Sequence, residues 1–253
     1  MLFRSPTNYL EEGATDPRRR LLAIQDRIIA VFEVLLCSSY PTQWVIAGAL
    51  PGLGISPRTG SGQLNVWFVT TLALADTVVL TGLICLLVAA RGQSLRRLLV
   101  GDRPLRGELA HGARLIPVAM LIAISALALL QLAAPSLRTV ARNPLRDLAD
   151  TWLDASLFGL VVIIAGGIRE EIQRAFLLDR FEQSLGGTRV GVLVTSVSFG
   201  AGHLSQGLDA AVATGLLGAL WAITYARRRS IVGPVISHAG FNVLELLQAV
   251  ASS

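Results

Sequence analysis

The segment LFGLVVIIAGGIREEIQR, residues 157–174, joins an apolar run to a dense group of charges. No charged residue occurs in its first half, whereas Glu170 and Glu171 follow as adjacent carboxylates with Arg174 close behind. A charged side chain in an apolar environment is costly unless it is paired or has a function. The segment therefore predicts a helix at membrane depth that ends in a functional charge cluster.

The composition of the 253 residues is typical of a membrane protein. Hydrophobic residues make up 53% and charged residues only 15%, whereas a soluble domain carries about 25% charged residues. Cys37 and Cys85 lie in apolar runs, where they are expected to be buried as small hydrophobic residues. Because several runs approach the length that a spanning helix needs, the sequence predicts an all-α polytopic transmembrane helical bundle with about seven to eight membrane helices.

The apolar runs divide the chain into a polar N-terminal tail, residues 1–20, and a single transmembrane domain, residues 21–253. The first membrane helix is expected over residues 28–53, and a charged helix over residues 169–185 follows the quoted segment. The remaining apolar runs cover residues 64–90, 115–134, 152–168, 190–203, 208–226 and 231–249. The short alternating segments of a membrane β-barrel are missing from the sequence.

All 22 basic residues are arginines, and they concentrate between the apolar runs. This placement indicates membrane topology and argues against nucleic acid as a partner. The groups at residues 18–20, 91–114 and 227–229 are expected to share the cytoplasmic side with the N-terminus. The arginines at residues 138–146 then fall on the outer side. The bias towards arginine suggests a bacterial protein, so the expected location is a bacterial plasma membrane.

Asp76 is the only charged residue in the apolar run at residues 64–90. An ionisable residue at membrane depth suggests a function. The alternative is that Asp76 faces the interior of the bundle and accepts a hydrogen bond from a nearby hydroxyl such as that of Thr77. This structural interpretation is preferred, because no residue at a helical spacing pairs with Asp76.

Glu170, Glu171 and Arg174 can interact within one helix. Residues three or four apart share a helix face, so either glutamate can reach Arg174. If one carboxylate is tied to the arginine, the other stays free, and a free carboxylate of this kind suits a general base. A charge cluster that only caps the end of the helix is the alternative.

Two histidines and an asparagine lie in later apolar runs. Phe199 and His203 are four residues apart, as are His238 and Asn242, so each pair lies on one helix face. Hydrogen bonding between helices is the commoner role of such residues, but His238 and Asn242 could also stabilise a developing oxyanion. Together with the glutamate pair at the same depth, these residues favour a chemical role.

These motifs resemble those of the CPBP family of intramembrane proteases, the group of CAAX endopeptidases and bacteriocin-processing (Abi-type) proteins. That family carries E-E-x-x-x-R, F-x-x-x-H and H-x-x-x-N in this order on successive helices. Phe199 to His203 matches the second motif and His238 to Asn242 matches the third. The first motif is one residue short before Arg174. By this resemblance, residues 152–250 would form the protease core.

The shortened first motif can be aligned in two registers. With the glutamates aligned, Glu170 is the base and Glu171 pairs with Arg174. With the arginine aligned, Glu170 becomes the partner of Arg174 and Arg169 stands in the position of the base. The first register is preferred. The departure from the motif also leaves open a catalytically inactive member that acts as an immunity factor or a membrane scaffold.

The resemblance implies an intramembrane endopeptidase that acts on a peptide or protein substrate at the lipid bilayer, for example a C-terminal or leader peptide. Glu170, assisted by His203, would activate water, and His238 and Asn242 would stabilise the oxyanion. Three further residues belong to the expected site: Glu171 as a catalytic residue, and Arg174 and Phe199 as structural support.

The family has also been described as metal-dependent. Glu170, His203 and His238 could supply three zinc ligands with an open position, which would make the protein a metalloprotease. The His-Glu-x-x-His motif is missing, however, and a glutamic mechanism without a cofactor is preferred. A transporter that relays protons is a third alternative, which the lack of internal repeats disfavours.

Overall fold

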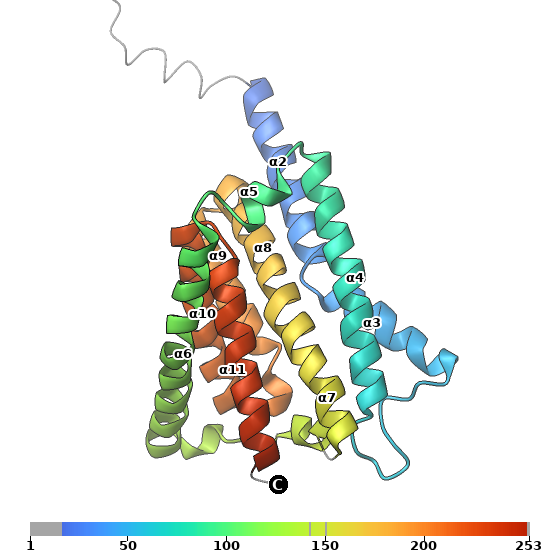
Figure 1. The fold of residues 1–253 in the computed structure, drawn as a ribbon. Coiled ribbons are helices and arrows are strands. Elements are labelled where there is room, and N and C mark those ends of the chain that lie inside the picture. The colour runs from blue at the N-terminus through green and yellow to red at the C-terminus, as the bar shows by residue number, and fades with distance from the viewer. Residues whose placement is uncertain (1–16, 142, 150, 252–253) are drawn as a thin grey trace, which may run out of the picture.

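The computed structural model describes residues 17–141, 143–149 and 151–251. Long helices pack side by side into a bundle, and α3 lies oblique to them (Figure 1). No strand occurs in the described ranges, where an isolated bridge between Arg58 and Leu64 is the nearest feature. The predicted all-α bundle is confirmed.

At the start of the N-terminal half, the structure has two helices where the sequence predicts one. Its elements are α2 (Pro17–Leu36), α3 (Tyr40–Ala49), η1 (Leu50–Leu53), α4 (Val66–Ala90), α5 (Leu95–Leu99) and α6 (Leu105–Ala133). The single helix expected over residues 28–53 is wrong, because the chain turns at Ser39, whose φ is 70°. Pro41 then occupies the first turn of α3, where a missing N–H costs little. Residues 17–20 of the predicted polar tail belong to α2, and residues 1–16 lie outside the described part.

The C-terminal half contains the quoted segment within one long helix. Its elements are η2 (Pro135–Leu137), η3 (Pro144–Ala149), α7 (Trp152–Val161), η4 (Val162–Arg169), α8 (Glu170–Ser184), α9 (Thr188–Ala201), η5 (Leu204–Gln206), α10 (Leu208–Arg228) and α11 (Val232–Ala251). The sequence predicts two helices over residues 152–168 and 169–185, but α7, η4 and α8 run on as 33 continuous residues. The middle part, η4, is π-helical. Such turns are rare and often mark functional sites.

Among the described residues, four helices are long and apolar enough to cross a membrane: α4, α6, the continuous helix of α7, η4 and α8, and α10. Helix α9 is apolar but shorter. Large apolar side chains on the outer faces of α4 and α6 are exposed, for example Val78, Leu86, Leu121 and Leu132. Such a surface is suited to lipid rather than to water. The chain is therefore an integral membrane protein, and the number of its membrane helices stays a prediction.

The three arginine-rich groups lie at one end of the bundle. Helix α5 and the junction between α10 and α11 lie at this end, and the start of α2 projects beyond it (Figure 1). Arg103 donates a hydrogen bond to the carbonyl of Arg228 at 3.2 Å, and the N–H of Ile231 donates to the carbonyl of Leu99 at 2.8 Å. This grouping agrees with the shared side predicted from the sequence. That this side is cytoplasmic stays a prediction.

Two glycines let α11 approach η4 closely. A Cβ at Gly167 would lie 2.7 Å from the Cβ of Ala239, and a Cβ at Gly166 would lie 2.7 Å from Nδ2 of Asn242. A side chain at Gly167 would force the two helices apart, as at other close helix crossings, whereas a side chain at Gly166 would displace the Asn242 amide. The glycines thus bring the helix that carries His238 against the helix that carries the glutamates.

Candidate active site

Glu171 is the centre of a buried charge cluster. Its carboxylate accepts hydrogen bonds from Nε of Arg174 at 3.1 Å and from Nη2 at 3.2 Å, and Nδ1 of His238 lies 2.9 Å from Oε1. Glu171 and Arg174 are only 1% and 3% exposed. An ionised carboxylate can only accept, so this contact places a proton on Nδ1 of His238. Glu171 therefore orients both Arg174 and the His238 ring.

Glu170 lies in a more open environment. Its Oε1 accepts a hydrogen bond from Nη2 of Arg169 at 3.3 Å, and its Oε2 lies 3.7 Å from Nε2 of His238. The side chain of Glu170 is 19% exposed, whereas that of Glu171 is 1% exposed. Of the two adjacent glutamates, Glu170 is the one whose carboxylate can meet water and a substrate.

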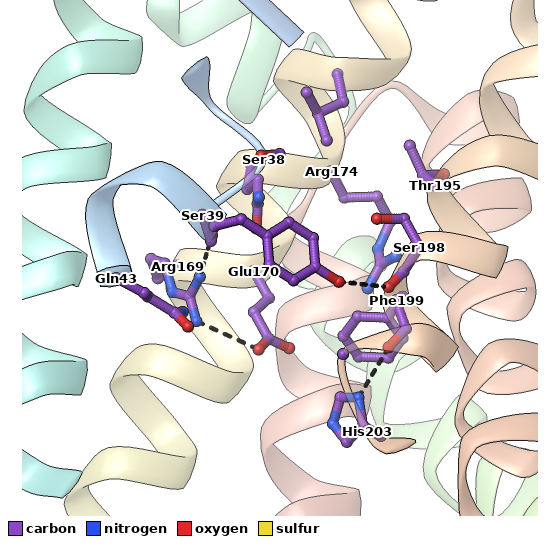
Figure 2. Close-up of a pocket in the computed structure, with 14 residues that line it drawn as sticks. Ser38, Ser39, Gln43, Arg169, Glu170, Arg174, Thr195, Ser198, Phe199 and His203 are labelled. Carbon is purple, nitrogen blue, oxygen red and sulfur yellow. Dashed lines mark hydrogen bonds and ion pairs between the residues drawn. The ribbon is translucent and has the colours of Figure 1, made fainter. Parts of the chain in front are cut away.

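His203 follows the C-terminal end of α9. Its Nδ1 lies 2.8 Å from the carbonyl oxygen of Phe199. A carbonyl oxygen only accepts, so Nδ1 carries the hydrogen and Nε2 keeps its lone pair. Figure 2 shows the His203 ring and the Glu170 carboxylate at the same pocket, His203 from the turn after α9 and Glu170 from α8. His203 can therefore accept a proton, or a hydrogen bond from water, at Nε2.

Phe199 contacts three side chains of the site. Its ring centroid lies 4.9 Å from that of His203 and 5.7 Å from that of His238. On another side, the guanidinium carbon of Arg174 lies 4.6 Å from the same centroid, in the range of a cation–π contact. Phe199 thus contacts all three side chains, and its role as structural support stays a prediction.

Trp221 of α10 is a site residue that was not predicted from the sequence. Its ring stacks on that of His238, with centroids 3.7 Å apart and planes inclined by 15°. Its Nε1–H donates a hydrogen bond to Oγ of Ser237 at 3.1 Å. A lone tryptophan among small apolar residues has no spacing pattern that would single it out. Together with Glu171, Trp221 fixes the plane of the His238 ring.

Asn242 lies one helical turn beyond His238 and contacts the π-helical segment. Its Nδ2 donates a hydrogen bond to the carbonyl of Val162 at 3.3 Å. A side-chain amide carries two N–H hydrogens, so one remains for a group in the adjoining cavity. Asn242 is thus suited both to holding η4 and to donating to a bound group.

Two cavities meet at Glu170 and His203. The larger has a volume of about 420 Å³ and also reaches His238 and Asn242, and the smaller has a volume of about 170 Å³ and lies towards α3. Arg169, Glu170, Phe199 and His203 line both cavities. Four predicted catalytic residues therefore line the larger cavity: Glu170, His203, His238 and Asn242. Glu171 contacts the His238 ring.

The predicted zinc ligands are not gathered around a common point. Within the described ranges, no three His, Cys, Asp or Glu side chains are grouped so that they could hold a metal ion. In this arrangement Glu170, His203 and His238 do not form an assembled three-ligand zinc site, and the metal dependence of the protein stays a prediction.

The site lies within the part of the chain that is similar to a known family. Residues 152–244 match the model of a family described as type II CAAX prenyl endopeptidase Rce1-like. This match supports the assignment of this part of the chain to the CPBP and CAAX protease group. The resemblance to the CPBP and CAAX group predicted from the motifs is thereby confirmed. Neither a curated protein nor a solved structure matches the chain.

The matched segment begins at the first residue of α7 and ends within α11, so it includes every site residue predicted from the sequence. The match to a protease family model supports a proteolytic function in general. Helices α2 to α6 lie outside the matched residues, although α3 and α4 reach the site through Arg169.

Proposed function

We propose that the protein is an intramembrane endopeptidase in which Glu170 activates the hydrolytic water. The observation that carries this proposal is the different environment of the two glutamates. Glu171 is held by Arg174 and His238, whereas Glu170 lies where the two cavities meet. A general base has to be within reach of a water and of the substrate. Glu170 meets this requirement.

In the proposed reaction, Glu170 takes a proton from a water that is also hydrogen-bonded to Nε2 of His203. The resulting hydroxide attacks the carbonyl carbon of the scissile peptide bond and forms a tetrahedral intermediate. The proton then passes from Glu170 to the nitrogen of the leaving group, and the peptide bond breaks. The hydrogen bond to Phe199 supports this role, because it leaves the lone pair of His203 on Nε2.

Asn242 is the proposed oxyanion donor. One amide hydrogen is engaged by Val162, and the second can stabilise the negative oxygen of the intermediate. His238 would add a second donor at Nε2 in its doubly protonated form, with its ring held by Glu171 and Trp221. A donor that is fixed before the reaction stabilises the intermediate without the cost of reorganisation.

The proposed substrate is a membrane-associated peptide segment, because the site lies among helices that are suited to the bilayer. The C-terminal segment of a prenylated protein, as the family description indicates, and a leader peptide are the two substrate classes to compare. We also propose that the arginine-rich end faces the cytoplasm of a bacterial cell.

Cleavage of a peptide library by the detergent-purified protein tests the proposed base. Glu170→Gln keeps the size of the side chain but removes the base, so kcat should fall by about 10²- to 10⁴-fold. Glu182→Gln, at the arginine-rich end, is the matched control and should keep its activity. Equal activity in both variants would contradict the role of Glu170. Stoichiometric zinc with chelator-sensitive cleavage would instead make His203 and His238 metal ligands.

The shortened first motif favours one alternative, an inactive family member that acts as an immunity factor or a membrane scaffold. In that case the wild-type protein cleaves no peptide, and the cellular phenotype is intact in Glu170→Ala and in His203→Ala. Loss of the phenotype in both variants, while the proteins still accumulate in the membrane, would exclude this alternative.

A further inference from the structure

Asp76 is a buried charge that the proposed mechanism does not use. It lies in the middle of α4 and is 0% exposed. The hydroxyl of Thr77, its expected partner, donates instead to the carbonyl of Ala73 at 2.7 Å. Thr77, the hydroxyl named as an example, is therefore wrong, but the prediction that Asp76 faces the bundle interior and accepts a hydrogen bond from a hydroxyl is confirmed. The partners of Asp76 come from distant parts of the chain.

These partners come from α3 and from η4. Oδ1 of Asp76 accepts a hydrogen bond from Oγ1 of Thr42 at 2.5 Å, and Oδ2 accepts one from Nε2 of Gln43 at 3.2 Å. Nη1 of Arg169 lies 3.3 Å from Oδ2. A buried carboxylate is tolerated when hydrogen bonds and an opposite charge compensate for its lost hydration. Asp76 meets this condition through residues that are remote in sequence.

The guanidinium of Arg169 bridges Asp76 and Glu170. Its Nη1 donates a hydrogen bond to Oγ of Ser39 at 2.6 Å and pairs with Asp76, while its Nη2 donates to Oε1 of Glu170 at 3.3 Å. Figure 2 shows Arg169 between Ser39 and Glu170 at the edge of the pocket. Because the guanidinium is a planar fork with fixed directions, contacts on one branch determine where the other branch points.

We infer that Asp76 and Arg169 are positioning residues for the carboxylate of Glu170, which rests on the proposed role of Glu170 as the base. Asp76 and Ser39 hold one branch of the guanidinium. The other branch holds Oε1 of Glu170 and leaves Oε2 directed towards His238. Two carboxylates share one cation, so Arg169 orients Glu170 without being its exclusive partner.

The loss of Asp76 has a specific consequence under this inference. With Asp76 neutral, Glu170 is the carboxylate that still pairs with Arg169, and the guanidinium moves towards it. A close ion pair between Arg169 and Glu170 would engage the carboxylate oxygen of Glu170 that has to take the proton from water. Asp76 lies outside residues 152–244, so the N-terminal helices contribute a part of the site that the three motifs do not contain.

Steady-state kinetics of Asp76→Asn, Arg169→Gln and the double variant test this inference. Each single variant should lower kcat by about 10- to 100-fold, as expected for a base displaced by roughly 1 Å, with little change in KM. The double variant should be no slower than Arg169→Gln, because Asp76 acts through Arg169. Asp26→Asn, an exposed carboxylate of α2, is the matched control and should behave as the wild type. Losses that multiply in the double variant, or a change in KM alone, would overturn the inference.

Milder variants keep the test valid if a neutralised Asp76 prevents folding. Ser39→Ala removes one hydrogen bond to Arg169 and should also lower kcat, and Arg169→Lys, which keeps the charge, should be faster than Arg169→Gln. If the wild type and Glu170→Gln both cleave nothing, the proposed function fails together with this inference. If Glu170→Gln is inactive while Asp76→Asn is fully active, only the positioning role fails.

Discussion

Replacement of Gly167 by alanine should push α11 away from η4. The added Cβ would lie 2.7 Å from Cβ, 3.2 Å from Cα and 3.3 Å from the backbone nitrogen of Ala239. Ordinary contacts begin at 3.4 Å, so the closest pair has to separate by 3.4 − 2.7 = 0.7 Å. These atoms belong to the α11 backbone and to its first side-chain carbon. No flexible side chain can therefore move aside, and the helix itself has to shift.

The shift of α11 should lower both the stability and the activity of the protein. Overpacking costs about 1–3 kcal/mol, while alanine gains about 1 kcal/mol over glycine within a helix, so the free energy of unfolding should fall by about 0–2 kcal/mol. His238 precedes Ala239, and its Nδ1 is now 2.9 Å from Glu171. A displacement near 1 Å at a catalytic group costs up to about 100-fold in rate. We therefore expect kcat to fall by roughly 10- to 100-fold, with a small loss of stability.

Gly82→Ala provides the matched control for this prediction. Gly82 lies within α4, and a Cβ added there would meet nothing within 4 Å. The control should keep its kcat and unfold at the same or a slightly higher temperature. Peptide cleavage and thermal unfolding in detergent measure both effects. If Gly167→Ala and Gly82→Ala have the same kcat and the same unfolding temperature, the close approach of α11 to η4 does not control the site.

Three further predictions concern the buried charges, the free thiols and the metal. Arg174→Gln removes the partner of buried Glu171 and should lower the free energy of unfolding by about 3–5 kcal/mol. If denaturant titrations show a loss below about 1 kcal/mol, the pair between Arg174 and Glu171 is not buried. Burial raises the pKa of the Cys37 thiol to about 12, so the reactive thiolate is scarce at pH 8. The thiolate fraction rises about tenfold per pH unit as long as the pH is below the pKa. In a Cys85→Ser protein, a maleimide at pH 8 should therefore modify Cys37 only after unfolding, as mass spectrometry would show, and rapid native labelling would refute this. Complete chelation should leave peptide cleavage unchanged if the metal-free mechanism holds, and loss of cleavage that added zinc restores would refute it.

The family, the helical class and the predicted site residues could be recognised from the sequence because they depend on local patterns. Long apolar runs form helices whatever their neighbours are, since a bilayer requires that backbone groups be satisfied within the segment. Residues four apart lie on one helix face, so the spacing alone pairs Phe199 with His203 and His238 with Asn242. The roles proposed for these residues in catalysis stay predictions.

Tertiary structure decided which groups meet. The sequence allowed either glutamate to reach Arg174, and the orientation of α8 against α11 places Glu171 between Arg174 and His238. The stacking of Trp221 on His238 and the continuous helix through η4 carry no local signal, whereas Pro41 marks the start of α3. Asp76 and Arg169 are 93 positions apart (169 − 76 = 93), and their contact exists because α4 packs against η4. A buried charge is costly unless an opposite charge or a hydrogen-bonding group lies beside it. The packing of the helices therefore decides which residue becomes its partner.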